Sequence, residues 1–121
     1  MKRKLFKPLL LKDGRQYTIG TRVEIRPCVF DDLSEMEKSQ ASTVSMADRS
    51  SVFFDRHCIV SIDGTRVALV RYTSVFKKPS DAAMRRAFFD GTAKTPSGKI
   101  VEPDGHDDLG FPAWPLILGI V

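Results

Sequence analysis

The residues whose types and spacing could do chemistry lie close together near the end of the chain. Asp104, His106, Asp107 and Asp108 place three carboxylates and one imidazole in a single short segment. Such a group could hold Mg²⁺ or Zn²⁺, and His106 could act as a general base. The other interpretation is a tight turn, because Asp-Gly sequences are common in turns. A small metal-dependent enzyme that uses residues 104–108 is therefore one of three functions to weigh.

No other pattern in the sequence points to catalysis. The acidic cluster is not an EF-hand, because the positions that require glycine and glutamate hold Leu109 and Pro115. The sequence contains no Walker motif, no nucleophile elbow and no zinc-binding spacing. His57, the only other histidine, borders an apolar run and is expected to pack or cap locally. We therefore expect a protein that is not an enzyme and that needs no metal or other cofactor.

The elements that must position these residues are organised around a hairpin between Phe53 and Phe76. Two apolar, β-branched runs are joined there by Asp63-Gly64, which favours a type I′ turn because this turn needs positive φ at both central residues. Both faces of the hairpin are largely apolar. A strand pair that is covered on both sides predicts either a small closed barrel or a sheet with a helix on one face.

Further strands are predicted in the first 30 residues. A second hairpin is expected around Asp13-Gly14. Val23 and Ile25 alternate with charged residues, which predicts a half-buried strand, and the following proline should end its pairing or place it at a sheet edge. Residues 1–8 form a basic arm, which we expect to extend into solvent or along a phosphate backbone.

One helix is predicted over residues 80–90. Ser80 or Asp81 can cap its N-terminus, and Gly91 can adopt the left-handed conformation that ends it. The face assigned to the core carries Met84, Ala87 and Phe88.

The opposite face of this helix is the first predicted binding surface. Phe89 lies there beside Arg85 and Arg86, and an exposed aromatic residue flanked by arginines has the composition of an interface hot spot. The alternative is that the C-terminal tail covers this turn of the helix.

Residues 31–51 are polar, acidic and rich in serine, and they form either a short helix or a long loop. A capping-box pattern at Ser34 and Glu37 favours the helix. Long loops are uncommon in a small domain unless they are functional, so this segment is a second candidate contact surface. The predicted partner-binding residues are Arg85, Arg86, Phe89, Asp31, Asp32, Glu35 and Glu37.

Nucleic-acid binding is the second function to weigh. The net charge is +4 and alternates in blocks, since residues 1–30 and 49–99 are basic whereas residues 31–48 and 100–121 are acidic. If the basic side chains lie on one face, they form a surface for phosphates, and nearby aromatic residues could stack on bases. The alternative is that they are spread over the surface for solubility. The predicted nucleic-acid-binding residues are Lys2, Arg3, Lys4, Arg66, Arg71, Lys77 and Lys78.

Length and composition predict one domain, residues 1–121, of the α+β class. We expect a small antiparallel barrel or curled sheet, SH3-like in strand count, with one short helix and an irregular tail, residues 102–121, packed on the domain. The apolar runs are too short for a signal peptide or a membrane span, which predicts a soluble cytoplasmic protein. Cys28 and Cys58 lie in apolar runs and should be buried and reduced, with a disulfide as the alternative.

The tail also carries a resemblance. Residues 101–121, VEPDGHDDLGFPAWPLILGIV, contain Glu-Pro-Asp-Gly followed by Asp, Gly, Pro, Trp and Leu-Gly-Ile. This order resembles a C-terminal pattern of short uncharacterised proteins encoded by bacterial phages and plasmids. The resemblance implies a mobile-element protein, for which blocking a host defence complex is a recurrent task. We therefore expect a non-enzymatic protein that covers a surface of a host protein or nucleoprotein complex.

Overall fold

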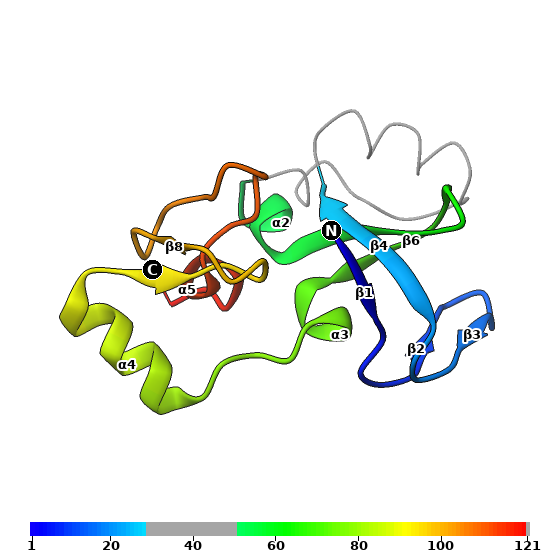
Figure 1. The fold of residues 1–121 in the computed structure, drawn as a ribbon, viewed down its shortest axis with the longest axis horizontal. Coiled ribbons are helices and arrows are strands. Elements are labelled where there is room, and N and C mark those ends of the chain that lie inside the picture. The colour runs from blue at the N-terminus through cyan, green and yellow to red at the C-terminus, as the bar shows by residue number, and fades with distance from the viewer. Residues whose placement is uncertain (29–50, 121) are drawn as a thin grey trace.

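The structure, a computed structural model, describes residues 1–28 and 51–120, and Figure 1 shows its fold. Its elements in chain order are β1 (Lys2–Lys4), β2 (Leu9–Leu10), β3 (Gln16–Tyr17), β4 (Arg22–Pro27), α2 (Ser51–Arg56), β5 (His57–Ile62), β6 (Thr65–Arg71), α3 (Tyr72–Val75), α4 (Asp81–Asp90), β7 (Ala93–Lys94), β8 (Ile100–Val101) and α5 (Trp114–Ile117). Antiparallel strands and short helices make this an α+β protein, as predicted.

The largest sheet is antiparallel and open. β4 lies between β1 and β5, and β6 pairs with the other side of β5, so β1 and β6 are the two edges. Two smaller sheets are formed by β2 with β3 and by β7 with β8. The strands of the described residues therefore do not form the closed barrel, which was one of the two arrangements that the sequence predicted.

The predicted central hairpin consists of β5 and β6. Its turn has positive φ at both Asp63 (51°) and Gly64 (79°), as a type I′ turn requires. A β-bulge between Val60 and Ser61 shifts the pairing with β6. The half-buried strand is β4, in which Val23 and Ile25 are buried as predicted.

Both ends of the predicted hairpin are helical and not extended, so the strands are shorter than the sequence indicated. Residues 53–56 belong to α2, and α3 follows β6 directly. One helical turn brings Tyr72, Val75 and Phe76 to the core together, whereas an extended chain would direct neighbouring side chains to opposite faces. Burial of these three side chains explains the change from strand to helix.

The N-terminal segment is an edge strand and not the free basic arm that was predicted for residues 1–8. β1 pairs with β4, and the amino group of Met1 donates a hydrogen bond to the carbonyl oxygen of Ile25 at 2.8 Å. The guanidinium carbon of Arg3 lies 4.3 Å from the centre of the Phe76 ring, and burial lowers the pKa of Arg3. Backbone pairing and this cation–π contact hold the segment on the sheet.

The second predicted hairpin is formed by β2 and β3. Its turn spans more than Asp13-Gly14, because the backbone N–H of Leu11 donates to the carbonyl oxygen of Arg15 at 2.9 Å. Nη2 of Arg15 also donates to the carbonyl oxygen of Val67 on β6, at 2.9 Å. This contact satisfies one acceptor on an edge strand, where unpaired backbone groups would otherwise invite further pairing.

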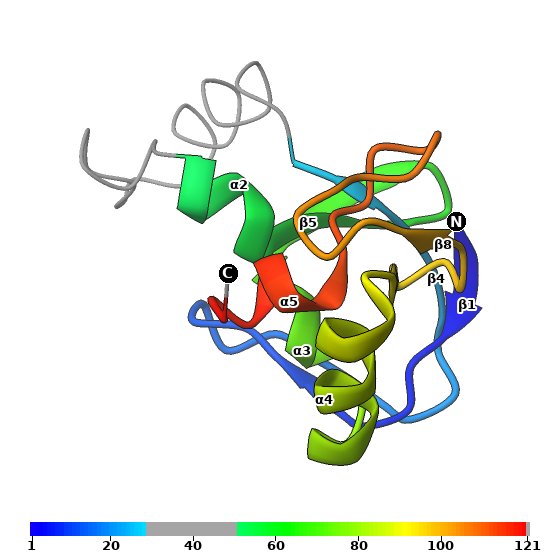
Figure 2. The same ribbon diagram turned by 90° about the vertical axis from the view of Figure 1, so that its left-hand side faces the viewer.

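One apolar core joins the sheet to the C-terminal half of the chain. The rings of Tyr72, Phe76 and Phe111 are neighbours, with centres between 6.1 and 6.2 Å apart. Trp114 and Ile117 of α5 belong to the same cluster. The views in Figures 1 and 2 place the main sheet on one side of this core and α4, β8 and α5 on the other.

The tail packs on the domain, as predicted. Phe111, Ala113 and Trp114 are buried, and the short strand β8, which pairs with β7, precedes this segment. The last turn of the tail is the helix α5. Burial does not extend to the end of the apolar run, since Ile120 is 49% exposed.

The two cysteines are buried free thiols, as expected. Cys58 lies in the main core, and burial raises the pKa of its thiol. Cys28 packs in a smaller cluster with Ile59, Phe54 and Leu69, on the other face of the sheet. Apolar side chains therefore cover the hairpin on both faces, as its composition indicated.

Candidate binding surfaces

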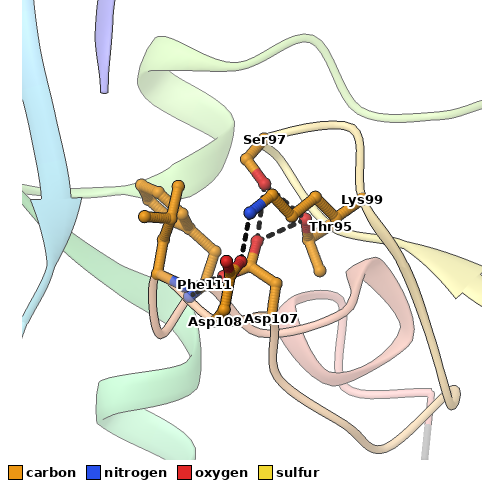
Figure 3. Close-up of polar contacts among 7 residues, drawn as sticks. Thr95, Ser97, Lys99, Asp107, Asp108 and Phe111 are labelled. Carbon is orange, nitrogen blue, oxygen red and sulfur yellow. Dashed lines mark hydrogen bonds and ion pairs between the residues drawn. The ribbon is translucent and has the colours of Figure 1, made fainter.

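The two acidic tail residues labelled in Figure 3, Asp107 and Asp108, have different partners. Asp107 accepts hydrogen bonds on both carboxylate oxygens. Its Oδ2 accepts from the hydroxyl groups of Thr95 at 2.7 Å and Ser97 at 2.5 Å, which lie in the β7–β8 turn. Its Oδ1 accepts from the backbone N–H groups of Leu109 and Phe111, both at 2.9 Å. The carboxylate therefore ties the tail to the β7–β8 turn.

The electrostatics of Asp107 are those of a structural carboxylate. Burial alone raises the pKa of Asp107, but the hydrogen bonds from the two hydroxyl groups and two backbone N–H groups outweigh it, so the pKa lies below the ordinary value. Asp108 instead forms an ion pair with Lys99. Among the residues that the structure describes, no group of three His, Cys, Asp or Glu side chains could hold a metal ion. The tail segment thus gives no geometric support to the metal-dependent alternative.

His106 has a separate partner, Asp55 of α2, which the sequence gave no reason to expect. His106 Nε2 and Asp55 Oδ1 lie 3.1 Å apart, and both residues line a cavity of about 340 Å³ beside Cys28. A carboxylate in this position can fix the orientation of an imidazole, as a general base requires. Cys28, however, is only 4% exposed and packs with Ile59 and Phe54. These are the surroundings of an inert structural thiol and not of a nucleophile.

The residues of the first predicted binding surface, Arg85, Arg86 and Phe89, lie on helix α4. Ser80 caps this helix, because its Oγ accepts a hydrogen bond from the backbone N–H of Ala83 at 3.1 Å, and Gly91 ends it at φ 67°. Both features were predicted. The helix lies at the edge of the molecule in Figure 1, faces the viewer in Figure 2, and buries only Met84 and Ala87.

The aromatic residues of α4 are more exposed than the sequence predicted. Phe89 is 92% exposed, as expected of a contact residue, and the tail does not cover it. Phe88 was assigned to the core but is 48% exposed. The reason is that α4 packs against small side chains, since Ala87 lies with Ala93 and Ala113. Arg85 and Arg86 are exposed on the same helix, one turn before Phe89, so the three side chains lie on one exposed face.

The predicted nucleic-acid-binding residues are not on one surface. Lys2 and Lys4 are exposed on one face of β1, opposite Glu24 and Arg22 of β4, and all four residues line a groove of about 490 Å³. Arg3 also borders this groove, but its guanidinium lies over Phe76. Alternation along β1 therefore divides the basic tripeptide between two faces.

The remaining predicted basic residues lie elsewhere. Arg66 lies on β6 and pairs with Ser61 of β5, which lines the groove. Arg71 is at the far end of β6 and lines a different cavity, and Lys77 and Lys78 are exposed between α3 and α4. The predicted acidic contact residues Asp31, Asp32, Glu35 and Glu37 lie outside the described residues.

No known protein family, curated protein or solved structure matches the chain. In the described part of the chain, none of the helices has both the length and the apolar character that crossing a membrane requires.

Proposed function

We propose that this chain is a non-enzymatic binding protein that docks on a partner protein through the exposed face of α4. The observation that carries the proposal is the 92% exposure of Phe89 beside Arg85 and Arg86. Hot spots in protein interfaces are enriched in aromatic residues and arginine, and they need a large side chain that a partner pocket can desolvate.

The chemistry of α4 indicates what kind of partner surface fits it. Full burial of a phenylalanine side chain contributes about 1.5–3 kcal/mol, so Phe89 can act as an anchor in an apolar pocket. Arg85 and Arg86 favour acidic residues around that pocket, because guanidinium groups bind carboxylates with paired hydrogen bonds. The partner is therefore a protein with an apolar pocket and an acidic rim.

The biological setting of the proposal comes from the tail. Its resemblance to proteins encoded by phages and plasmids supports a protein that works in the cytoplasm of a bacterial host. There it covers a working surface of a host protein or nucleoprotein complex and so inhibits it, a host defence complex being one such target. The mechanism is occlusion and requires no cofactor.

Affinity capture from a bacterial lysate tests this function. The wild-type chain should retain a defined partner with and without nuclease treatment, and Phe89→Ser should lose it. Leu10→Ser is the matched control, because Leu10 is an exposed apolar residue, 67% accessible, on the β2–β3 hairpin. Equal capture by both variants would reject α4 as the docking surface.

Direct nucleic-acid binding is the second candidate, and the groove of Lys2, Lys4 and Arg22 favours it. Fluorescence anisotropy with single-stranded and duplex DNA should then show binding that weakens steeply between about 50 and 200 mM salt. The double variant Lys2→Glu with Lys4→Glu should abolish this binding, whereas Lys77→Glu with Lys78→Glu, outside the groove, should weaken it less. Equal loss in both double variants would indicate non-specific attraction only.

A further inference from the structure

A second arginine-lined cavity lies where α2, the end of β6 and α5 meet. Its volume is about 180 Å³, and it is lined by Arg56, Arg71, Thr73, Ile117 and Leu118. Figure 2 shows α2 next to α5, which brings the last residue of α2 beside the end of the tail. None of the lining residues belongs to α4, so this cavity is separate from the proposed docking face.

The guanidinium of Arg56 is partly withdrawn from water. Among the described residues, its buried Nε has no hydrogen-bond partner. Within residues 1–28 and 51–120, neither Arg56 nor Arg71 forms an ion pair. A buried donor that lacks a partner costs free energy, and the cost is larger for a charged group. An anion in the cavity would supply a counter-charge for the Arg56 guanidinium.

The backbone at Gly119 lies directly beside the Arg56 guanidinium. A Cβ atom on residue 119 would lie 2.4 Å from Nη2 of Arg56, so any side chain at this position would displace the guanidinium. Gly119 also has φ 71°, a conformation that other residues rarely adopt. The glycine therefore leaves room for a charged group beside the backbone.

We propose that this cavity binds a phosphate group, either free phosphate or the terminal phosphate of a small monoester. Two guanidinium groups offer paired N–H donors that match the oxygens of a tetrahedral anion, and the Thr73 hydroxyl can donate a further hydrogen bond. The volume suits a phosphate, whereas sites for larger ligands usually exceed about 300 Å³. Ile117 and Leu118 shield the cavity and strengthen the electrostatic attraction.

Titration with inorganic phosphate, followed by ¹⁵N–¹H NMR spectra at constant ionic strength, tests the proposal. Phosphate should shift the amide signals of residues 56, 71–73 and 117–119, and sodium chloride should not. A small phosphate monoester should shift the same signals, more strongly if a monoester is the ligand and more weakly if free phosphate is. Shifts spread over the other basic residues, or identical shifts with chloride, would overturn the site.

Variants separate this site from general attraction by positive charge. Arg56→Gln should weaken phosphate binding by at least about tenfold, because a charge-assisted hydrogen bond is lost. Arg71→Gln changes an exposed residue, so it should weaken phosphate binding and leave the fold intact. This variant therefore tests the site even if Arg56→Gln unfolds the protein. Arg85→Gln with Arg86→Gln is the matched control and should bind phosphate as the wild type does. Unchanged affinity in Arg71→Gln would contradict the proposal.

Discussion

The sheet half of the molecule, residues 1–28 and 51–76, and the tail half, residues 77–120, are held together in different ways. The sheet half contains the four-stranded sheet, in which apolar residues such as Val23 and Ile25 face the core. The strands of the tail half are two residues long, and its shape depends on particular polar contacts. The most important of these contacts are the cap at Ser80 and the four hydrogen bonds of Asp107.

The two halves therefore depend on different kinds of interaction. Apolar packing stabilises the sheet half, whereas single polar contacts define the shape of the tail half. Apolar packing is distributed over many side chains, so a conservative substitution in the sheet half removes only part of it. A polar contact with defined geometry depends on a single side chain, and its loss leaves several buried partners unsatisfied. The tail half should therefore respond to acid and to single polar substitutions more strongly than the sheet half does.

The largest effect is expected where the two halves meet. Phe111→Ala should lower the free energy of unfolding by about 3–5 kcal/mol, because Phe111 is 1% exposed and packs against Tyr72 and Phe76. Chemical denaturation followed by circular dichroism measures this loss. Phe89→Ala is the control and should change stability by less than about 0.5 kcal/mol, since Phe89 is on the surface. A loss below about 1 kcal/mol for Phe111→Ala would mean that the two halves are stable independently.

The next effect concerns the polar contact of the tail half. Asp107→Asn should destabilise the protein by about 2–3 kcal/mol at neutral pH, because an amide cannot accept all four hydrogen bonds. Asp104→Asn, at an exposed carboxylate in the same segment, should cost little.

The effect of Asp107 should also depend on pH. Its folded-state pKa lies below the ordinary value, so its stabilisation is present above about pH 4 and is lost as the pH falls through the folded-state pKa. Urea denaturation at several pH values should therefore show that wild type and Asp107→Asn approach each other in acid. A constant difference between them down to about pH 2 would mean that the carboxylate is not the source of the effect.

The sheet half was largely predictable from its sequence, and the reasons are local. Asp63-Gly64 has a strong preference for one turn type, and alternation assigned Val23 and Ile25 to the core face. The pairing of β1 with β4 was not predictable, because Arg3 finds Phe76 only through the tertiary fold. Charge in a short terminal segment carries no information about such a partner.

The tail half shows where sequence reasoning fails for a site. Asp104, His106, Asp107 and Asp108 are close in sequence, yet Asp107 is directed to hydroxyl groups in a turn and His106 to Asp55 of α2. The closeness of these residues in the sequence predicted a cluster, but the course of the backbone directs their side chains to different partners. On α4 the helix period placed Phe89 opposite the core face and left open whether the tail covers it, and it is 92% exposed; the same period assigned Phe88 to the core, where it is 48% exposed.

A smaller effect is expected at the start of α4. Ser80→Ala should destabilise the protein by about 1 kcal/mol, because the N–H of Ala83 loses its acceptor. Ser80→Asp is the matched variant and should retain most of the stability, since aspartate is also a good N-cap and its charge favours the helix N-terminus. Thermal unfolding of the three proteins measures the difference. If both variants lose stability equally, Ser80 contributes through packing and not through its hydrogen bond.

The smallest effect is expected at Tyr72, in the core of the sheet half. Its hydroxyl is buried and has no hydrogen-bond partner within residues 1–28 and 51–120, so Tyr72→Phe should leave stability at neutral pH within about 1 kcal/mol of wild type. Burial raises the pKa of Tyr72 above the unfolded value of about 10, so the wild type should lose stability as the pH rises beyond that value. The Tyr72→Phe variant should lose less over the same range, and the remainder comes from Cys58, whose thiol pKa is also raised by burial. Chemical denaturation of wild type and Tyr72→Phe at neutral and alkaline pH measures these stabilities. A loss above about 2 kcal/mol in Tyr72→Phe at neutral pH would show that the hydroxyl group has a stabilising partner.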